Sequence, residues 1–201
     1  MLPSIVVVLV IVAVFALWAT GVYNRLVFLR NEVKNAFAQI DVQLKRRYDL
    51  IPNLVETARK YVSHERETLE AVISARNQAS QAREAVHGDP TLATGLSSIA
   101  SLASAEGLLG SALGRLMAVV EAYPELKADE TLRELSEELT TTENRIGFAR
   151  QAYNDSVLEL NYRVQRFPDL IVAGLFGFKG MEMLQSTENE EERKAVKVKF
   201  D

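Results

Sequence analysis

The stretch that decides the fold is LRELSEELTTTENRIGFARQAYNDSVLELNYRVQRF, residues 132–167, because apolar or small residues recur in it at every third or fourth position. This spacing matches the period of an α-helix, about 3.6 residues, over roughly ten turns. The stretch therefore predicts one long helix whose stripe packs on other helices. The stripe consists of Leu132, Leu135, Leu139, Thr142, Ile146, Ala149, Tyr153, Val157, Leu160, Val164 and Phe167.

Residues 26–48 and 54–86 carry apolar stripes of the same period. The segment between them, Asp49-Leu-Ile-Pro-Asn53, predicts a turn, because Asp49 can cap a new helix whose first turn tolerates Pro52. The alternative is one kinked helix over residues 23–87, since the two stripes run nearly in phase across the proline. We favour the turn. It would return the chain to the membrane near Phe167, whereas a continuous helix would hold the apolar patch 170–178 far from lipid.

The stretch from Thr91 to Ala118 is rich in Ala, Ser, Gly and Leu and has only two charged residues, Glu106 and Arg115. Its serines, threonines and glycines disfavour a second membrane span, and it lacks the lysine of a phosphate-binding loop. It predicts a loose connection after Gly88-Asp89-Pro90, followed by a buried helix over residues 103–122. Four long segments joined by short breaks predict an all-α, up-down four-helix bundle.

Residues 5–22, IVVVLVIVAVFALWATGV, carry no charge. As a helix they span about 27 Å, close to the hydrocarbon thickness of about 30 Å. The run exceeds the usual apolar core of a signal peptide and no Lys or Arg precedes it, so it predicts a retained anchor. Basic residues follow the run, which predicts a single-pass inner-membrane protein with its N-terminus outside and its body in the cytoplasm. The anchor positions are Ile5, Leu9, Val12, Phe15, Trp18 and Val22.

The resulting organisation is an anchor over residues 1–23, a cytoplasmic helical bundle over 24–168, a short apolar segment over 169–184 that can lie at the interface, and a polar, mobile tail over 185–201. The net charge of −4 disfavours a nucleic-acid partner. The absence of cysteine excludes thiolate metal sites and cysteine nucleophiles. One Glu-x-x-His pair, Glu84 and His87, does not make a di-metal site, so we expect no cofactor.

Two polar clusters flank the stripes, one before and after Asp49 and the other around Glu143. They predict either a binding surface or helix-to-helix hydrogen bonds that fix register. The members are Arg46, Arg47, Asp49, Asn53, Glu56, Glu143, Asn144, Arg145 and Asn154, with Asn161 seven residues beyond the last. Candidate self-association positions are small or apolar: Gly107, Gly110, Gly114, Leu175, Phe176 and Phe178.

Several runs of the sequence resemble the LemA family. They are Tyr23-Asn-Arg-Leu-Val27, Leu29-Arg-Asn31, Ile40-Asp-Val-Gln-Leu-Lys-Arg-Arg47, Asp49-Leu-Ile-Pro-Asn-Leu-Val-Glu-Thr57, Glu121-Ala-Tyr-Pro-Glu-Leu-Lys127, Thr142-Glu-Asn-Arg145, Tyr153-Asn-Asp155 and Phe176-Gly-Phe178. The resemblance implies a bacterial inner-membrane protein with one N-terminal span and a cytoplasmic helical bundle. It implies no enzymatic activity. The sequence departs from the family at Met181-Glu-Met-Leu-Gln185, where an aromatic residue is expected.

The predicted function is a non-catalytic, membrane-anchored scaffold that self-assembles and presents its bundle to a protein partner at the cytoplasmic face. One alternative is a membrane-remodelling protein that uses residues 170–178 on lipid. Another is an adaptor for a membrane protease or a signalling complex. The expected partners are the lipid bilayer, further copies of the chain and an unidentified membrane or cytoplasmic protein.

Overall fold

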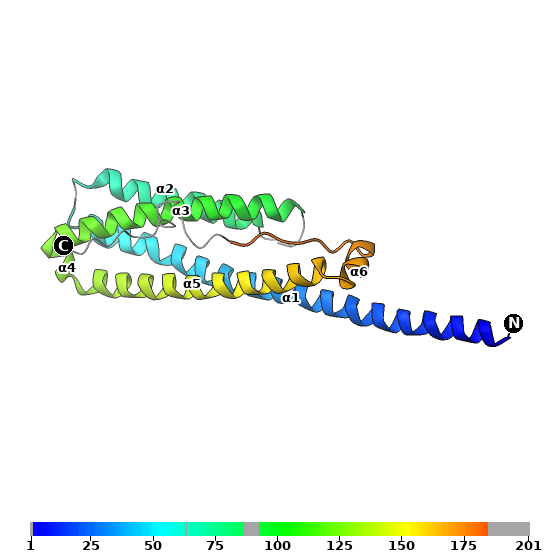
Figure 1. The fold of residues 1–201 in the computed structure, drawn as a ribbon. Coiled ribbons are helices and arrows are strands. Elements are labelled where there is room, and N and C mark those ends of the chain that lie inside the picture. The colour runs from blue at the N-terminus through cyan, green and yellow to red at the C-terminus, as the bar shows by residue number, and fades with distance from the viewer. Residues whose placement is uncertain (1, 63, 87–92, 185–201) are drawn as a thin grey trace, which may run out of the picture.

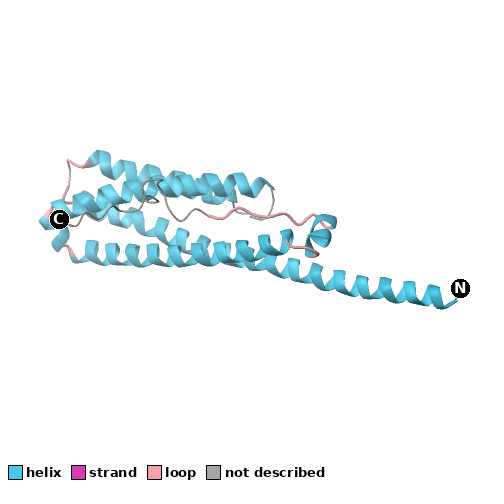
Figure 2. Ribbon diagram, in the orientation of Figure 1, coloured by secondary structure: helices cyan, strands magenta, loops and turns pink. Residues whose placement is uncertain are grey.

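The computed structural model describes residues 2–62, 64–86 and 93–184, and within these ranges it contains helices and no strand (Figures 1 and 2). The predicted all-helical fold is confirmed. The helices are α1 (Leu2–Arg59), α2 (Arg66–Val86), α3 (Ala93–Ala122), α4 (Pro124–Ala128), α5 (Glu130–Gln165) and α6 (Asp169–Leu175). The predictions for His87, for the break at Gly88-Asp89-Pro90 and for the tail 185–201 lie outside the described residues.

The long helices run lengthwise beside one another, and α1 extends far beyond the others (Figure 1). α1 packs along α5, α2 packs along α3, and α1 also contacts α2. The short α4 connects α3 to α5 at the end of the body farthest from the N-terminus. α6 lies at the opposite end, where α1 leaves the body (Figure 1).

The apolar stripes form the core of this body. On α1, every position predicted to be apolar and inward from Leu26 to Tyr48 is buried, and the stripe continues through Leu54 to Ala58. On α5, most of the predicted stripe is buried, including Leu132 and Tyr153. Leu135, Ala149 and Val164 are partly buried, and Phe167 is exposed, since it lies beyond the end of α5 with 73% of its surface accessible.

The predicted turn at Pro52 is wrong, because α1 continues through it to Arg59. A proline inside a helix leaves the carbonyl four residues earlier without its usual amide donor. Here that carbonyl belongs to Tyr48, and the Nε of Arg76 on α2 donates to it at 3.0 Å. The proline side chain itself is exposed and displaces nothing. A partner on α2 therefore preserves the helix, and the chain reverses after Arg59 instead.

The prediction of a loose connection before residue 103 is also wrong, because α3 begins at Ala93. Ile99 and Leu102 are buried in the core and hold this earlier part of the helix against the body. Two described helices are long and apolar enough to cross a membrane, α1 and α3. They differ in burial: Leu102, Leu109 and Leu116 of α3 pack inside the body.

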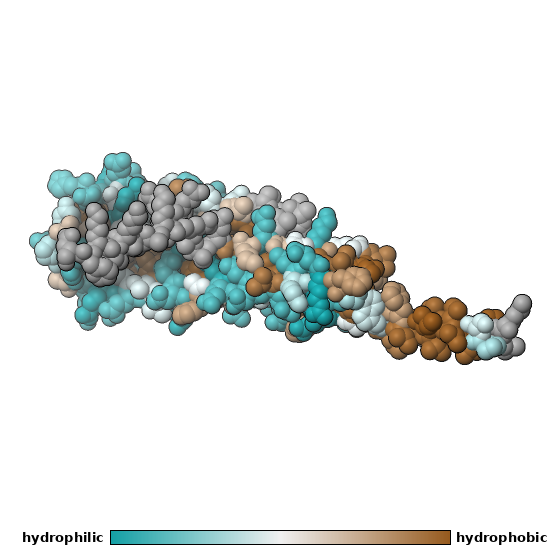
Figure 3. All heavy atoms as spheres, in the orientation of Figure 1, coloured by the Kyte–Doolittle hydropathy of each residue, from teal (hydrophilic) through white to brown (hydrophobic). Residues whose placement is uncertain are grey.

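The N-terminal part of α1 is apolar and is not covered by other described parts of the chain. Its side chains from Ile5 to Leu17 contact little else, with 63% of Leu9 and 76% of Leu17 exposed. Figure 3 shows this segment as a hydrophobic rod that projects from a largely hydrophilic body. An exposed apolar helix of this length indicates membrane localisation.

Candidate functional site

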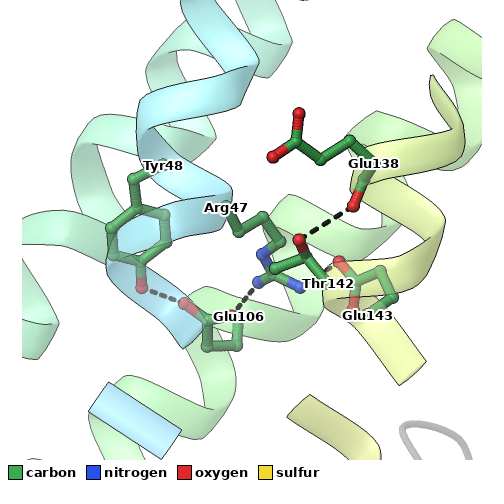
Figure 4. A network of polar contacts seen from close by, with 6 residues as sticks. All are labelled: Arg47, Tyr48, Glu106, Glu138, Thr142 and Glu143. Atoms are coloured by element: carbon green, nitrogen blue, oxygen red, sulfur yellow. Dashed lines mark hydrogen bonds and ion pairs between the residues drawn. The ribbon is translucent and has the colours of Figure 1, made fainter. Parts of the chain in front are cut away.

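The two predicted polar clusters meet in the middle of the body. Arg47 of α1 donates through Nη1 to Glu143 of α5 and through Nη2 to Glu106 of α3. Tyr48, the next residue of α1, donates its hydroxyl to the other carboxylate oxygen of Glu106. Figure 4 shows these side chains converging from three helices. The network therefore ties α1, α3 and α5 together.

The centre of this network is withdrawn from water. The side chains of Arg47 and Glu106 are only 4% and 3% exposed, whereas that of Glu143 is 42% exposed. A buried charge is tolerated only when partners replace its lost hydration. Glu106 has Arg47 and Tyr48 as partners, and burial raises the pKa of the Tyr48 hydroxyl to about 12. The hydroxyl is thus held in the protonated form that can donate to the carboxylate.

The other predicted members of the clusters are not all gathered here. Arg46 pairs with Glu138 on α5 at 2.6 Å, in an exposed contact beside the buried network. Thr142 uses its hydroxyl within α5, donating to the Glu138 carbonyl at 2.8 Å. The remaining members lie exposed on the outer faces of their helices, namely Asp49, Asn53, Glu56, Asn144 and Arg145.

A second set of polar contacts joins α1 to α2, and the sequence analysis missed it. Arg83 donates to both oxygens of Asp41, at 2.5 and 2.7 Å, and this hydrogen bonding raises the pKa of the guanidinium. Arg76 and Arg83 are seven residues apart, so they share one face of α2. That spacing in the sequence could have indicated a basic face of α2 that packs on another helix. For Glu106, the signal was its position as the only carboxylate in residues 91–118.

Asn154 and Asn161 of α5 bind a peptide backbone. Asn161 donates to the Met181 carbonyl at 2.7 Å and accepts from the Met181 amide at 2.7 Å. Asn154 makes the same two contacts with Leu184, both at 2.8 Å. These bonds stand in place of the predicted helix-to-helix bonds of Asn154. They hold residues 178–184, here called the strap, along α5.

At the end of the body where α1 leaves it, the predicted self-association residues of the apolar patch 170–178 divide into two groups. Leu175 and Phe176 are exposed, by 78% and 56%. Phe178 is partly buried, with its ring 5.7 Å from that of Tyr23 and 5.4 Å from the guanidinium carbon of Arg30. Phe178 therefore serves this chain's own packing.

The predicted glycine face of α3 leaves free space around it. A Cβ added to Gly107 or to Gly114 would meet no heavy atom within 4 Å. Gly110 and Gly114 border a hollow of about 310 Å³ that opens between α3 and α5 beside Arg47. Gly107 and Gly114 therefore pack closely against no neighbouring backbone in the described part of the chain, and their role as self-association positions stays a prediction.

The described residues hold no group of three or more His, Asp or Glu side chains placed to bind a metal ion. His64 lies exposed after the end of α1. The arrangement of charges in the buried network is suited to joining helices.

The chain is similar in sequence to several known proteins. The chain is 27% identical over 175 residues to magnetosome protein MamQ 2 of Paramagnetospirillum magneticum, covering 81% of this chain and 64% of the relative. It is 26% identical to magnetosome protein MamQ of Magnetospirillum gryphiswaldense, covering 80% of this chain and 63% of that protein. It is 25% identical to protein LemA of Metamycoplasma hominis, covering 89% of this chain and 76% of that protein.

The chain thus spans slightly less than two thirds of the magnetosome relatives that it matches. The family profile described as "LemA family" matches residues 36–200, which include the buried network, the two strap-binding asparagines and the strap. The chain belongs to the LemA family.

Proposed function

We propose that the protein is a non-catalytic, membrane-anchored scaffold whose α1, α2, α3 and α5 form an up-down four-helix bundle on the cytoplasmic side of the inner membrane. The observation that carries the proposal is the continuity of α1. One helix contains both the bare apolar residues 5–17 and the buried stripe that begins at Leu26. A continuous helix between bilayer and body fixes the height and orientation of the body, as a scaffold requires.

The polar contacts support a body that keeps one shape. α1 is joined to α2 by Arg83 and Asp41, to α3 by Arg47 and Glu106, and to α5 by Arg47 and Glu143. Buried ion pairs are weak evidence for stability, but they discriminate against alternative registers, because a shifted helix would leave charges unpaired. We infer that this network selects one arrangement of the four long helices.

Self-assembly is the second part of the proposal. The open glycine face of α3 would let a second copy approach closely, because Gly107 and Gly114 present no side chain and a Cβ built at either would meet no heavy atom within 4 Å in the described part of the chain. Relatives named as magnetosome proteins support a role in an assembled bacterial structure. The partner protein would bind the exposed polar surface of the body.

The test is the assembly state of the full-length chain in lipid nanodiscs and in detergent, measured by mass photometry. We expect particles with more than one copy, and we expect Gly107→Leu and Gly114→Leu to shift them toward a single copy. Gly147→Leu is the matched control, since Gly147 of α5 has equally open surroundings. A wild-type chain that stays single at every concentration would refute self-assembly.

Orientation is tested separately, using the absence of cysteine from the sequence. In Gln151→Cys, the introduced thiol lies on an exposed position of α5. A membrane-impermeant maleimide should label it in inverted inner-membrane vesicles and leave it unlabelled in right-side-out vesicles. The opposite pattern would place the body on the outer side and contradict the proposal.

A further inference from the structure

We propose that the body makes a second contact with the bilayer that α1 crosses, through an apolar foot formed by Phe167 and the outward face of α6. The inference rests on the proposed function in requiring that α1 be inserted. The foot consists of Phe167, Leu170, Ile171, Leu175 and Phe176, which are 73%, 45%, 49%, 78% and 56% exposed. Five large apolar side chains gathered at one end of the body form a surface that water solvates poorly.

Measured along the axis of α1, the foot lies level with the end of the apolar part of that helix. The ring of Phe176 is 4.8 Å from that of Tyr23, the residue that follows the uncharged run. Farther along, Arg25 of α1 faces Glu159 of α5 at 3.7 Å. α5 continues six residues beyond Glu159, which is about 9 Å. Its end therefore comes level with residue 19, inside the uncharged run.

Burial along α1 agrees with this height. Leu17 is bare, whereas Trp18, Ala19 and Val22 are each partly covered. Figure 3 shows hydrophobic surface over α6 close to the start of the hydrophobic rod. A bilayer whose interface lies near Tyr23 must consequently reach the foot as well.

The foot is held rigidly from its inner side. Val172 and Ala173 of α6 are buried, and the buried carboxylate of Asp169 accepts from Arg163 of α5 at 3.0 Å. Immediately after α6, Phe178 packs on Tyr23 and Arg30, and Asn161 pins the strap. These contacts fix α6 with its apolar residues directed away from the body.

Lipid is the occupant that the surroundings favour. The foot lies beside α1 through the contact of Phe176 with Tyr23, and two basic residues flank it in the sequence, Arg166 directly before Phe167 and Lys179 three residues after Phe176. Cations beside an apolar face suit the anionic headgroups of a cytoplasmic leaflet. Tyr162, which lies under the guanidinium of Arg166 at 5.7 Å, supplies an aromatic group of the kind that is enriched at membrane interfaces.

The experiment uses full-length protein reconstituted in vesicles of phosphatidylcholine and phosphatidylglycerol, with or without bromine on the acyl chains. The wild type has one tryptophan, Trp18, which reports on the anchor. In the double variant Trp18→Phe/Phe167→Trp, the tryptophan reports on the foot. The matched control is Trp18→Phe/Phe148→Trp, because Phe148 is also 73% exposed but lies about 28 Å farther along α5.

We expect brominated lipid to quench the probe at position 167 and to leave the probe at position 148 unchanged, with the emission maximum of the former at shorter wavelength. If each probe emits equally in brominated and in plain vesicles, the proposed contact between the foot and lipid is wrong. Protection of position 167 from both brominated lipid and aqueous acrylamide would also overturn it, and would show that a second copy covers the surface. Unquenched Trp18 in the wild type would instead refute the anchor, and with it the proposed function.

Discussion

Removing the cation at the centre of the buried network should be the most damaging single polar change in the body. Arg47→Met keeps an unbranched side chain and deletes the charge. It removes the ion pair of the Glu106 carboxylate with Arg47, and the carboxylate, which is 3% exposed, keeps its hydrogen bond from the Tyr48 hydroxyl. Breaking a buried pair from one side costs about 3–5 kcal/mol, because the surviving charge has neither water nor a counterion.

The two carboxylates should respond differently to the same kind of change. Glu106→Leu leaves Arg47 its contact with Glu143, so the main loss is the Tyr48 hydroxyl without an acceptor, about 1–3 kcal/mol. Glu143→Ala removes a partner that is 42% exposed, and a partly solvated pair is worth about 0–1 kcal/mol. The expected order of destabilisation is therefore Arg47, then Glu106, then Glu143.

The double variant Arg47→Met/Glu106→Leu should be more stable than Arg47→Met alone, because it removes the stranded charge together with its partner. The measurement is thermal unfolding of the full-length protein in detergent, followed by far-ultraviolet circular dichroism. For a chain of this size, 1 kcal/mol corresponds to about 2–4 °C in Tm, so Arg47→Met should lower Tm by roughly 6–20 °C. If Arg47→Met unfolds no earlier than Glu143→Ala, the network is not the buried junction described above.

Four further outcomes are expected. Burial raises the pKa of both Tyr48 and Tyr153 to about 12, so the free energy of unfolding should be insensitive to their ionisation below pH 10.0 and should fall as the pH rises from there through 12, because the unfolded chain loses these protons first; circular dichroism against pH will detect this. Tyr153→Phe should be neutral or stabilising, because its hydroxyl has no hydrogen-bond partner in the described part of the chain, whereas Tyr48→Phe should cost about 1–3 kcal/mol in thermal unfolding. Arg76→Met should cost about 1 kcal/mol, and less in a Pro52→Ala background, where the alanine amide can donate to the Tyr48 carbonyl. Asn161→Leu should release the strap, so that limited proteolysis cleaves it faster than in the wild type.

Helical periodicity was sufficient to predict the elements and most of the core. Each inward position of α1 from Leu26 to Tyr48 lies where the spacing placed it. The errors occurred where a distant partner changed a local preference. Pro52 reads locally as a helix start, and only the position of Arg76, contributed by α2, shows why the helix continues. A local pattern cannot supply that information, because the two residues meet only after α2 has folded back.

The height of α6 could not be predicted for a related reason. From the sequence alone, residues 170–178 were expected near the membrane only if the chain turned at Pro52, and far from it if α1 was continuous. The structure separates the two questions, because α5 returns along α1 and brings α6 to Tyr23 without that turn. The end of the body at which the last helix finishes depends on how many times the chain reverses direction. The chain reverses after Arg59 instead of at Pro52, so the number of reversals is the same and α6 still lies at the end near Tyr23.

The spacing of the strap-binding asparagines has a simple geometric explanation. Asn154 and Asn161 are seven residues apart on α5, which is about 10.5 Å along a helix. Their partners, Met181 and Leu184, are three residues apart, which is about 10 Å in an extended chain. An amide side chain that donates to the carbonyl and accepts from the amide of one residue binds only its backbone, so these two hydrogen bonds do not depend on the side chain at that position. The clamp can therefore hold methionine at position 181, where the family resemblance leads one to expect an aromatic residue, and the buried side chains of Met181 and Leu184 add core contacts to the register that the two asparagines set.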